Sequence, residues 1–234
     1  PEQLRLKTHM LSSLFGTVLG ASAPGVRETI GLEGSGDARD PAAPWGFRNK
    51  AHFVFGPGRA GNSLAMGHYR RGSRHLVEVE ECPVHTEEGN RLAFRARDAL
   101  ARYGIAGVDE ETLRGLARHV VVRTGERSGQ TQATLVATRD DSRKLAAALR
   151  EFASGGGAPG GLHLNVHDRP GPFLFGRETR KIHGTERLLD EVAGASFLLS
   201  PTSFFQTSAR SAQKLVGVVL GFVPEADRRP IADL

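Results

Sequence analysis

Residues 119–138 have the sequence HVVVRTGERSGQTQATLVAT, which carries the clearest structural pattern in the chain. Two runs rich in β-branched residues, His119–Arg123 and Thr131–Thr138, flank the glycine-containing segment Thr124–Gly129. This pattern is typical of a β-hairpin, because β-branched side chains favour strands and glycine allows the chain to turn. The hairpin predicts an antiparallel sheet in the middle of the chain.

Further helices and strands are expected on both sides of the hairpin. Apolar residues at helical spacing, preceded in two cases by a capping residue, predict the helices. These are residues 3–18, residues 86–103, Asp109–Ala117, a helix capped by Asp140 or Asp141, and a helix capped by Thr207 or Ser208. Strands are expected at His52–Phe55, Met66–Arg70, His75–Val79, Leu162–Val166, Leu174–Ile182, Ser196–Ser200 and Pro230–Leu234, with Glu186–Val192 ambiguous between helix and strand. The order predicts an α+β fold followed by the start of an α/β domain.

Charge and cysteine content limit the classes of function. Lys and Arg number 31 against 26 Asp and Glu, a formal charge of +5 that suits a polyanionic partner such as RNA but is also common in soluble proteins. The single cysteine excludes an internal disulfide and indicates a reducing compartment, so we expect a cytoplasmic location. No apolar run approaches the ~20 residues of a membrane span. Because the chain begins at Pro1 without Met and ends within an expected strand, we expect a fragment.

The segment Phe47-Arg48-Asn49-Lys50 joins a Pro-containing loop to a strand. Its cationic side chains could bind a phosphate, and its aromatic ring could stack on a base. A solvated junction between loop and strand explains the same residues, since Arg and Lys are mostly exposed in any protein. The residue chemistry alone favours this simpler interpretation.

Cys82 lies between two glutamates and Pro83. A catalytic thiolate needs positive neighbours, and adjacent glutamates disfavour it. An iron–sulfur cluster needs several thiolates, so Cys82 is at most one ligand of a cluster whose other ligands lie outside the chain. A lone cysteine is most often a small buried apolar residue, and the chemistry alone favours that reading.

The segment Ser200–Gln206, with the sequence SPTSFFQ, lies between an expected strand and an expected helix. Two Phe rings offer stacking surface, and the Gln206 amide can both donate and accept hydrogen bonds. A helix entry held by apolar contacts is an equal alternative. The Gly-rich residues 154–161 lack the context of a phosphate-binding loop. The histidines show no metal-like spacing, and no Ser-His-Asp or paired-carboxylate signature is found.

Taken in order, six segments resemble the RNA uracil-5-methyltransferase family, which makes 5-methyluridine in ribosomal and transfer RNA. The segments are Gln3-Leu4 with Lys7, Phe47–Ala51, Val77–Pro83, Arg118–Gly125, Phe197–Gln206 and Ile231–Leu234. The resemblance covers nearly the whole chain, and the Arg-Asn-Lys form of the second segment favours the ribosomal members. It implies residues 1–40 as a helix and linker, 41–199 as a central RNA-facing domain, and 200–234 as the start of a Rossmann-like S-adenosylmethionine-dependent domain.

The resemblance also implies ligands for individual residues. Gln206 and Phe205 match residues beside S-adenosylmethionine, and Phe204 matches the aromatic residue beside the target base. Cys82 matches the last ligand of a 4Fe–4S cluster that many members hold and others lack; the remaining cysteines and an RNA-binding barrel would precede Pro1. Phe47, Arg48, Asn49 and Lys50 are expected to bind RNA, with 23S rRNA favoured over tRNA. We expect a monomer without membrane association.

The chain departs from the family in one respect that concerns catalysis. The family's nucleophilic Cys and its Glu base would both follow Leu234, so no catalytic residue is assigned and this piece alone is expected to be inactive. Three rival interpretations remain: a non-catalytic RNA-binding module, an iron–sulfur electron carrier suggested by Cys82-Pro83, and a degenerate homologue that has lost its catalytic half.

Overall fold

The computed structural model describes residues 2–31, 45–58, 64–169 and 173–222. Contacts between residues divide the chain into two compact units, residues 1–43 and 44–234. The first unit holds helix α1 (Glu2–Leu19) and the 3-10 turn η1 (Gly20–Ser22). The expected helix over residues 3–18 is confirmed, although none of the α1 residues is buried. Thr29 donates its backbone N–H to the Thr8 hydroxyl at 2.8 Å and holds the returning chain against the helix.

The second unit is built on a seven-stranded sheet in the order β3-β2-β1-β4-β5-β6-β7. Neighbouring strands are antiparallel except for β5 and β6, which run parallel, so the expected mostly antiparallel sheet is confirmed as a mixed one. The predicted hairpin is β4 (Ala117–Thr124) paired with β5 (Thr131–Ala137). The other strands are β1 (Lys50–Gly56), β2 (Ala65–Tyr69), β3 (Leu76–Glu78), β6 (Gly161–Val166) and β7 (Glu178–Gly184).

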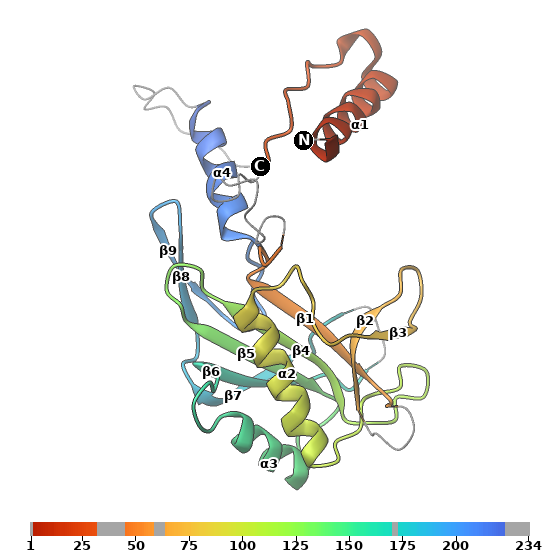
Figure 1. The fold of residues 1–234 in the computed structure, drawn as a ribbon, viewed down its shortest axis with the longest axis vertical. Coiled ribbons are helices and arrows are strands. Elements are labelled where there is room, and N and C mark those ends of the chain that lie inside the picture. Colours follow the sequence, from red (N-terminus) through yellow and green to blue (C-terminus); the bar gives the residue numbers. More distant parts are fainter. Residues whose placement is uncertain (1, 32–44, 59–63, 170–172, 223–234) are drawn as a thin grey trace. The chain divides into compact units, whose positions relative to one another are not determined.

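Helices α2 (Glu87–Arg102) and α3 (Arg143–Phe152) cover one face of this sheet (Figure 1). Each helix begins at a side chain that accepts a hydrogen bond from the first turn, Thr86 for α2 and Ser142 for α3. The core between helices and sheet is apolar. It includes Phe53, Phe55, Leu92, Val120, Leu135, Leu145, Phe152, Leu162 and Leu164.

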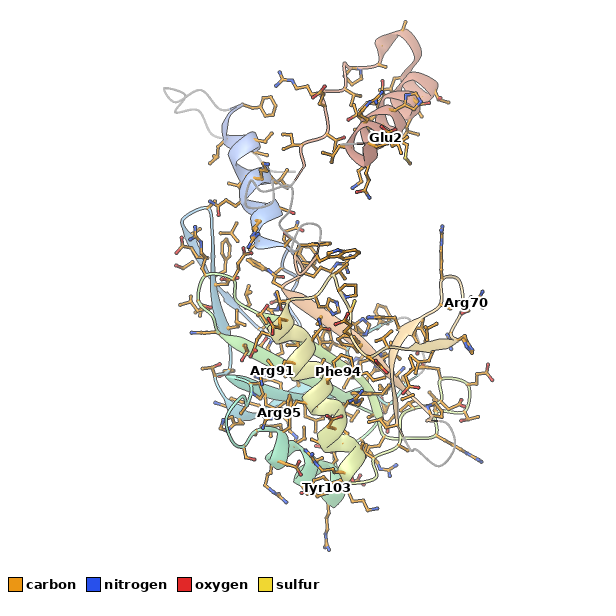
Figure 2. All side chains as sticks on the ribbon, in the orientation of Figure 1. Glu2, Arg70, Arg91, Phe94, Arg95 and Tyr103 are labelled. Atoms are coloured by element: carbon orange, nitrogen blue, oxygen red, sulfur yellow. The ribbon has the colours of Figure 1, made fainter. Side chains whose placement is uncertain are left out.

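Two arginines of α2 fix the Gly-rich loop between α3 and β6. Arg91 donates to the Gly157 carbonyl at 3.1 Å, and Arg95 donates to the Gly156 carbonyl at 3.4 Å. Figure 2 labels both side chains on α2. The Gly-rich residues form a loop, as the sequence predicted, and these two bonds hold it to α2.

The opposite face of the sheet is polar and is crossed by the chain that follows β6. Asn165 on β6 is fully buried and makes four hydrogen bonds with this segment. They include one from its side-chain N–H₂ group to the Gly176 carbonyl and one from the Gly176 N–H to its side-chain oxygen, at 3.1 and 2.7 Å. Because buried polar groups are stable only when bonded, this pairing holds the crossing segment on the sheet.

A two-stranded ribbon and a last helix follow the sheet. Strands β8 (Leu188–Val192) and β9 (Ala195–Leu199) pair with each other, which settles the ambiguous segment as a strand. Helix α4 (Ala209–Leu220) begins at Ser208, whose hydroxyl accepts from the Ser211 N–H at 3.2 Å. Within the described residues, no helix is long and apolar enough to cross a membrane.

Two local predictions were wrong, and the strand expected at Leu174–Ile182 is β7, which runs from Glu178 to Gly184. The expected helix Asp109–Ala117 is instead a series of turns that leads into β4 at Ala117, because Leu113 and Gly115 take positive φ angles of 55° and 116° that a helix does not allow. The Asp109 carboxylate accepts the N–H groups of Glu111 and Thr112, each at 2.9 Å, and so stabilises a turn. Ser142 caps α3, in place of the expected Asp140 or Asp141. The expected strand at Pro230–Leu234 lies outside the described residues.

Candidate functional site

Two of the segments with candidate chemistry meet at one end of the seven-stranded sheet. The pairing register places Lys50 at the start of β1 beside Arg123 at the end of β4 and Gln132 at the start of β5. The Asn49 N–H donates to the Thr207 carbonyl at 2.7 Å. Segments more than 150 residues apart in the sequence are thereby joined through the backbone.

The segment Phe47–Lys50 is held on its other side by the residues after Cys82. The Arg48 N–H donates to the Val84 carbonyl at 2.8 Å, and the Thr86 N–H donates to the Arg48 carbonyl at 3.2 Å. Arg48 is exposed, Phe47 and Lys50 are half-buried, and Asn49 is 5% exposed. The backbone is therefore fixed from two sides, with the Arg48 side chain left in solvent.

The loop Ser200–Gln206 is anchored by Arg123. Arg123 is 4% exposed and donates from its Nη2 to the Ser203 carbonyl at 2.8 Å. Phe205 packs against Phe197, with ring centroids 5.4 Å apart, and against the small apolar cluster of α4 and β8. Phe204 is 82% exposed, and Gln206 is exposed as well. The loop thus presents one ring and one amide to solvent while the second ring holds it to the protein.

Sequence reasoning missed Asp190, which organises the hairpin turn beside this loop. Asp190 is 2% exposed and accepts the N–H groups of Glu126 and Arg127 at 3.2 and 3.0 Å. Its charge also favours the protonated form of Arg123. The sequence did offer one signal for this role. Asp190 is an acidic residue at an inward position of the alternating strand Leu188–Val192, and a charge at such a position needs a partner.

Positive charge is concentrated at this end of the sheet. Burial lowers the pKa of Lys50, and the neighbouring Arg123 charge lowers it further. The pKa of Arg123 is also lowered by burial, although Asp190 opposes this shift. The Lys50 Nζ lies 5.9 Å from the centre of the Phe175 ring, which favours a cation there. Partly desolvated cations on adjacent strands repel each other, and an anion such as a phosphate would relieve that repulsion.

Two neutral histidines lie beside these cations on the same face of the sheet. His52 Nε2 and His119 Nδ1 are 3.4 Å apart. Burial is the main cause that lowers the pKa of His52 to about 4 and that of His119 to about 3. At neutral pH the positive charge of this region therefore comes from Lys and Arg side chains.

Cys82 is half-buried and packs against the main core. Asn90 holds its backbone, accepting from the Cys82 N–H and donating to the Cys82 carbonyl, both at 3.0 Å. No group of three or more His, Cys, Asp or Glu side chains in the described part of the chain could hold a metal ion. These residues alone do not fit a 4Fe–4S cluster, and a ligand role for Cys82 stays a prediction.

Known proteins are similar to this chain in sequence and in fold. None of the protein-family models matches it. A protein of Streptococcus mutans described as an uncharacterized RNA methyltransferase is 28% identical over 221 residues, covering 94% of this chain and 47% of the relative. A protein of Streptococcus agalactiae with the same description is 30% identical over 179 residues, covering 76% of this chain and 39% of the relative. One from Halalkalibacterium halodurans is 26% identical, covering 94% and 46%.

The fold is that of a solved uracil methyltransferase. The crystal structure of Pyrococcus abyssi tRNA (uracil-54, C5)-methyltransferase in complex with S-adenosyl-L-homocysteine matches with a TM-score of 0.68 and 16% identity. The match covers 94% of this chain and 48% of that one. The chain spans less than half the length of each of these relatives. It is therefore related to RNA methyltransferases and has the fold of a uracil-C5 enzyme over this span, in agreement with the resemblance.

Proposed function

We propose that this chain is the RNA-facing part of an S-adenosylmethionine-dependent RNA uracil-5-methyltransferase. The observation that carries the proposal is the backbone junction between Asn49 and Thr207, strengthened by the bond from Arg123 to Ser203. It brings a cationic segment and a loop with an exposed ring to the same end of the sheet. An enzyme that modifies a base in folded RNA must move that base out of its stack before reaction. Cationic residues beside an exposed aromatic ring suit this task, because they can hold the phosphate backbone while the ring stacks on the base.

The residues divide into an RNA side and a methyl-donor side. On the RNA side, Arg48 and Lys50 supply charge for the phosphate backbone, and the exposed Phe204 ring supplies a stacking surface for a base. Phe47 and Asn49 complete this segment, and the buried Asn49 acts through its backbone position. On the donor side, the Gln206 amide can both donate to and accept from S-adenosylmethionine, and Phe205 supports the loop.

S-adenosylmethionine supplies the methyl group when it is bound. The residues of this chain bind and orient, and we assign none of them a bond-forming role. The proposed substrate is 23S rRNA, since the Arg48-Asn49-Lys50 form is typical of the ribosomal members of the family that the sequence resembles. An RNA-binding module without methyl transfer is the alternative that the following experiment separates.

Transfer of a labelled methyl group tests the proposal. The full-length product of the coding region is incubated with labelled S-adenosylmethionine and unmodified 23S rRNA or tRNA, and the nucleosides are separated by mass spectrometry. We expect labelled 5-methyluridine in 23S rRNA. Label in tRNA would correct the proposed substrate, and label at another atom would correct the proposed reaction. RNA binding without any methyl transfer would favour the alternative, an RNA-binding module.

Replacement of Gln206 by Ala should weaken donor binding. Loss of a hydrogen-bond partner typically costs about 1–3 kcal/mol, which is roughly 5- to 150-fold in dissociation constant. Calorimetry with S-adenosylhomocysteine and the full-length protein measures this change. Gln213→Ala, at an exposed position on α4, is the matched control and should leave affinity unchanged. Equal donor affinity in the two variants would remove the assignment of Gln206.

Replacement of Arg48 by Ala should weaken RNA binding and reduce its dependence on salt. Each phosphate contact contributes about 0.7–0.9 to the slope of log affinity against log salt concentration. Titration of labelled rRNA at several salt concentrations gives that slope. The exposed Arg143 on α3 provides the control variant, Arg143→Ala. A slope that stays the same in Arg48→Ala means that Arg48 contacts no phosphate.

A further inference from the structure

The turn between β2 and β3 carries three arginines on a rigid frame. Residues 70–75 have the sequence RRGSRH, and all six are exposed. The Ser73 N–H donates to the Arg70 carbonyl at 3.0 Å, and the Arg70 N–H donates to the His75 carbonyl at 2.9 Å. Gly72 has a φ of 71°, which favours glycine in a tight turn. The arginines Arg70, Arg71 and Arg74 are therefore presented by a defined turn, which we call the arginine turn (residues 70–75).

The arginine turn carries positive charge without a carboxylate partner. None of the ion pairs among the described residues includes Arg70, Arg71 or Arg74. Some other surface arginines are paired, as Arg91 is with Glu88 and Arg210 is with Glu126. Three unpaired guanidinium groups within five residues repel one another. They gain most from a ligand that offers several anionic oxygens, since each guanidinium matches a phosphate with two parallel bonds.

The pairing register places the arginine turn at the same end of the sheet as the candidate site. Strand β2 is antiparallel to β1, with Gly56 opposite Ala65 and Val54 opposite Gly67. Continued by two residues, this register places Tyr69, the last residue of β2, level with His52, two residues from Lys50 at the start of β1. Neighbouring strands are about 5 Å apart. An RNA strand that crosses Arg48 and Lys50 would reach the arginine turn within a few nucleotides.

Figure 1 shows the β2–β3 hairpin extending beyond the body of the sheet, and Figure 2 labels Arg70 on it, apart from the labelled side chains of α2. Charges can also protect an exposed sheet edge from pairing with another chain. That role requires charges along the edge strand β3 itself, where Glu78 lies, whereas the arginines lie in the turn before it. Edge protection therefore does not explain them.

We propose that the arginine turn is a second contact with the RNA backbone, separate from Phe47–Lys50, and that it binds phosphates flanking the target nucleotide. This inference rests on the proposed function for the identity of the polyanion. Because the contacts are to phosphates, the arginine turn contributes to affinity for any RNA of suitable shape and carries no preference for a base. It increases RNA affinity without taking part in methyl transfer.

The test replaces Arg70, Arg71 and Arg74 together by Gln in the full-length protein. Loss of three phosphate contacts should lower the slope of log affinity against log salt by about two. At physiological salt we expect the dissociation constant for rRNA to rise on the order of tenfold. The KM for RNA should rise similarly, with kcat unchanged at saturating RNA.

The control removes the same charge from α3 with Arg143→Gln, Lys144→Gln and Arg150→Gln, three exposed positions on the helix-covered face. It should change the slope by much less, because its effect is limited to long-range charge. Equal slopes in the two triple variants would overturn the proposal. The proposal would also be overturned if the triple variant of Arg70, Arg71 and Arg74 bound RNA as tightly as the wild-type protein but no longer bound an acidic protein. That result would identify a protein surface as the partner of the arginine turn.

A photoreactive benzophenone side chain at position 71 provides a second measurement that does not depend on removing charge. Crosslinking to rRNA at position 71 and its absence at position 144 would support the contact; equal crosslinking at the two positions would contradict it. Failure of the full-length protein to methylate any RNA would remove the proposed function. The salt slope and the crosslink would still report whether the arginine turn binds RNA, so the two failures can be distinguished.

Discussion

Replacement of Arg118 by Ala should lower the free energy of unfolding by about 3–5 kcal/mol, the usual loss when one partner of a buried ion pair is removed. Arg118 is 1% exposed, and its Nη2 donates to both carboxylate oxygens of Glu110 at 3.0 Å. Its Nη1 donates to the carbonyls of His167 and Arg169 at 3.1 and 2.9 Å. The substitution leaves Glu110 and both carbonyls without this donor. Urea unfolding monitored by circular dichroism measures the loss.

The control is Arg97→Ala, which removes an exposed pair with Asp98 and should cost about 1 kcal/mol or less. Arg118→Lys should remain strongly destabilised, because an ammonium group cannot reproduce the planar fork. The substitution Glu110→Gln should lower the free energy of unfolding less in the Arg118→Ala variant than in the wild-type protein. In that variant the Glu110 carboxylate has already lost its partner. A loss below about 1 kcal/mol for Arg118→Ala would show that the pair does not stabilise the fold.

Acidification should unfold the protein steeply between pH 6.5 and 4. Burial is the largest cause of the lowered pKa of His52, His85 and His119, to about 4, about 4 and about 3. Because the unfolded chain binds these protons near pH 6.5, the stability from neutral imidazoles is complete above that pH and decreases as the pH falls. Each histidine contributes up to about 1.4 kcal/mol per pH unit. Urea midpoints at several pH values give the slope.

Variants test which residues cause this acid sensitivity. His119→Gln should reduce the slope of the free energy of unfolding against pH, between pH 6 and 4, by the equivalent of about one bound proton. A glutamine that keeps the packing against His52 should therefore give a more acid-resistant protein. Gln213→Ala, at an exposed position on α4 that carries no titratable group, should leave the slope unchanged. An equal slope in the wild-type protein and in His119→Gln would contradict the assignment of His119 as a buried neutral base.

Most secondary structure could be predicted from local patterns. The alternation and β-branched residues of His119–Arg123 and Thr131–Thr138 predicted the central hairpin, which is β4 and β5. Helices α2 and α4 followed from apolar residues at helical spacing, and α4 also from an expected capping residue at Thr207 or Ser208. These predictions succeeded because periodicity reports which side of a local element faces the core. Asp109–Ala117 failed because two positive φ angles, invisible to periodicity, end the helical path.

For the site, the sequence indicated the segments but could not specify their contacts. Phe47–Lys50 and Ser200–Gln206 were singled out from residue chemistry and family resemblance. Their functional assignments remain proposals, whereas their spatial proximity is a property of the fold. Arg118 lies within a motif matched by resemblance, yet its side chain faces Glu110 and the chain after β6. Charge alone therefore did not distinguish the buried Arg118 from the exposed Arg48.

The sequence by itself determined local conformation, the basic charge and the likeness to RNA methyltransferases, because each is contained in short stretches of residues. Only the tertiary structure decided that Arg123 meets Ser203, that Asp190 holds the hairpin turn, and that the arginine turn lies at the end of the sheet with Lys50. The physical reason is that these features involve residues about 20 to 80 positions apart and depend on strand order and register. Those features arise from packing the whole sheet, and no local pattern encodes them.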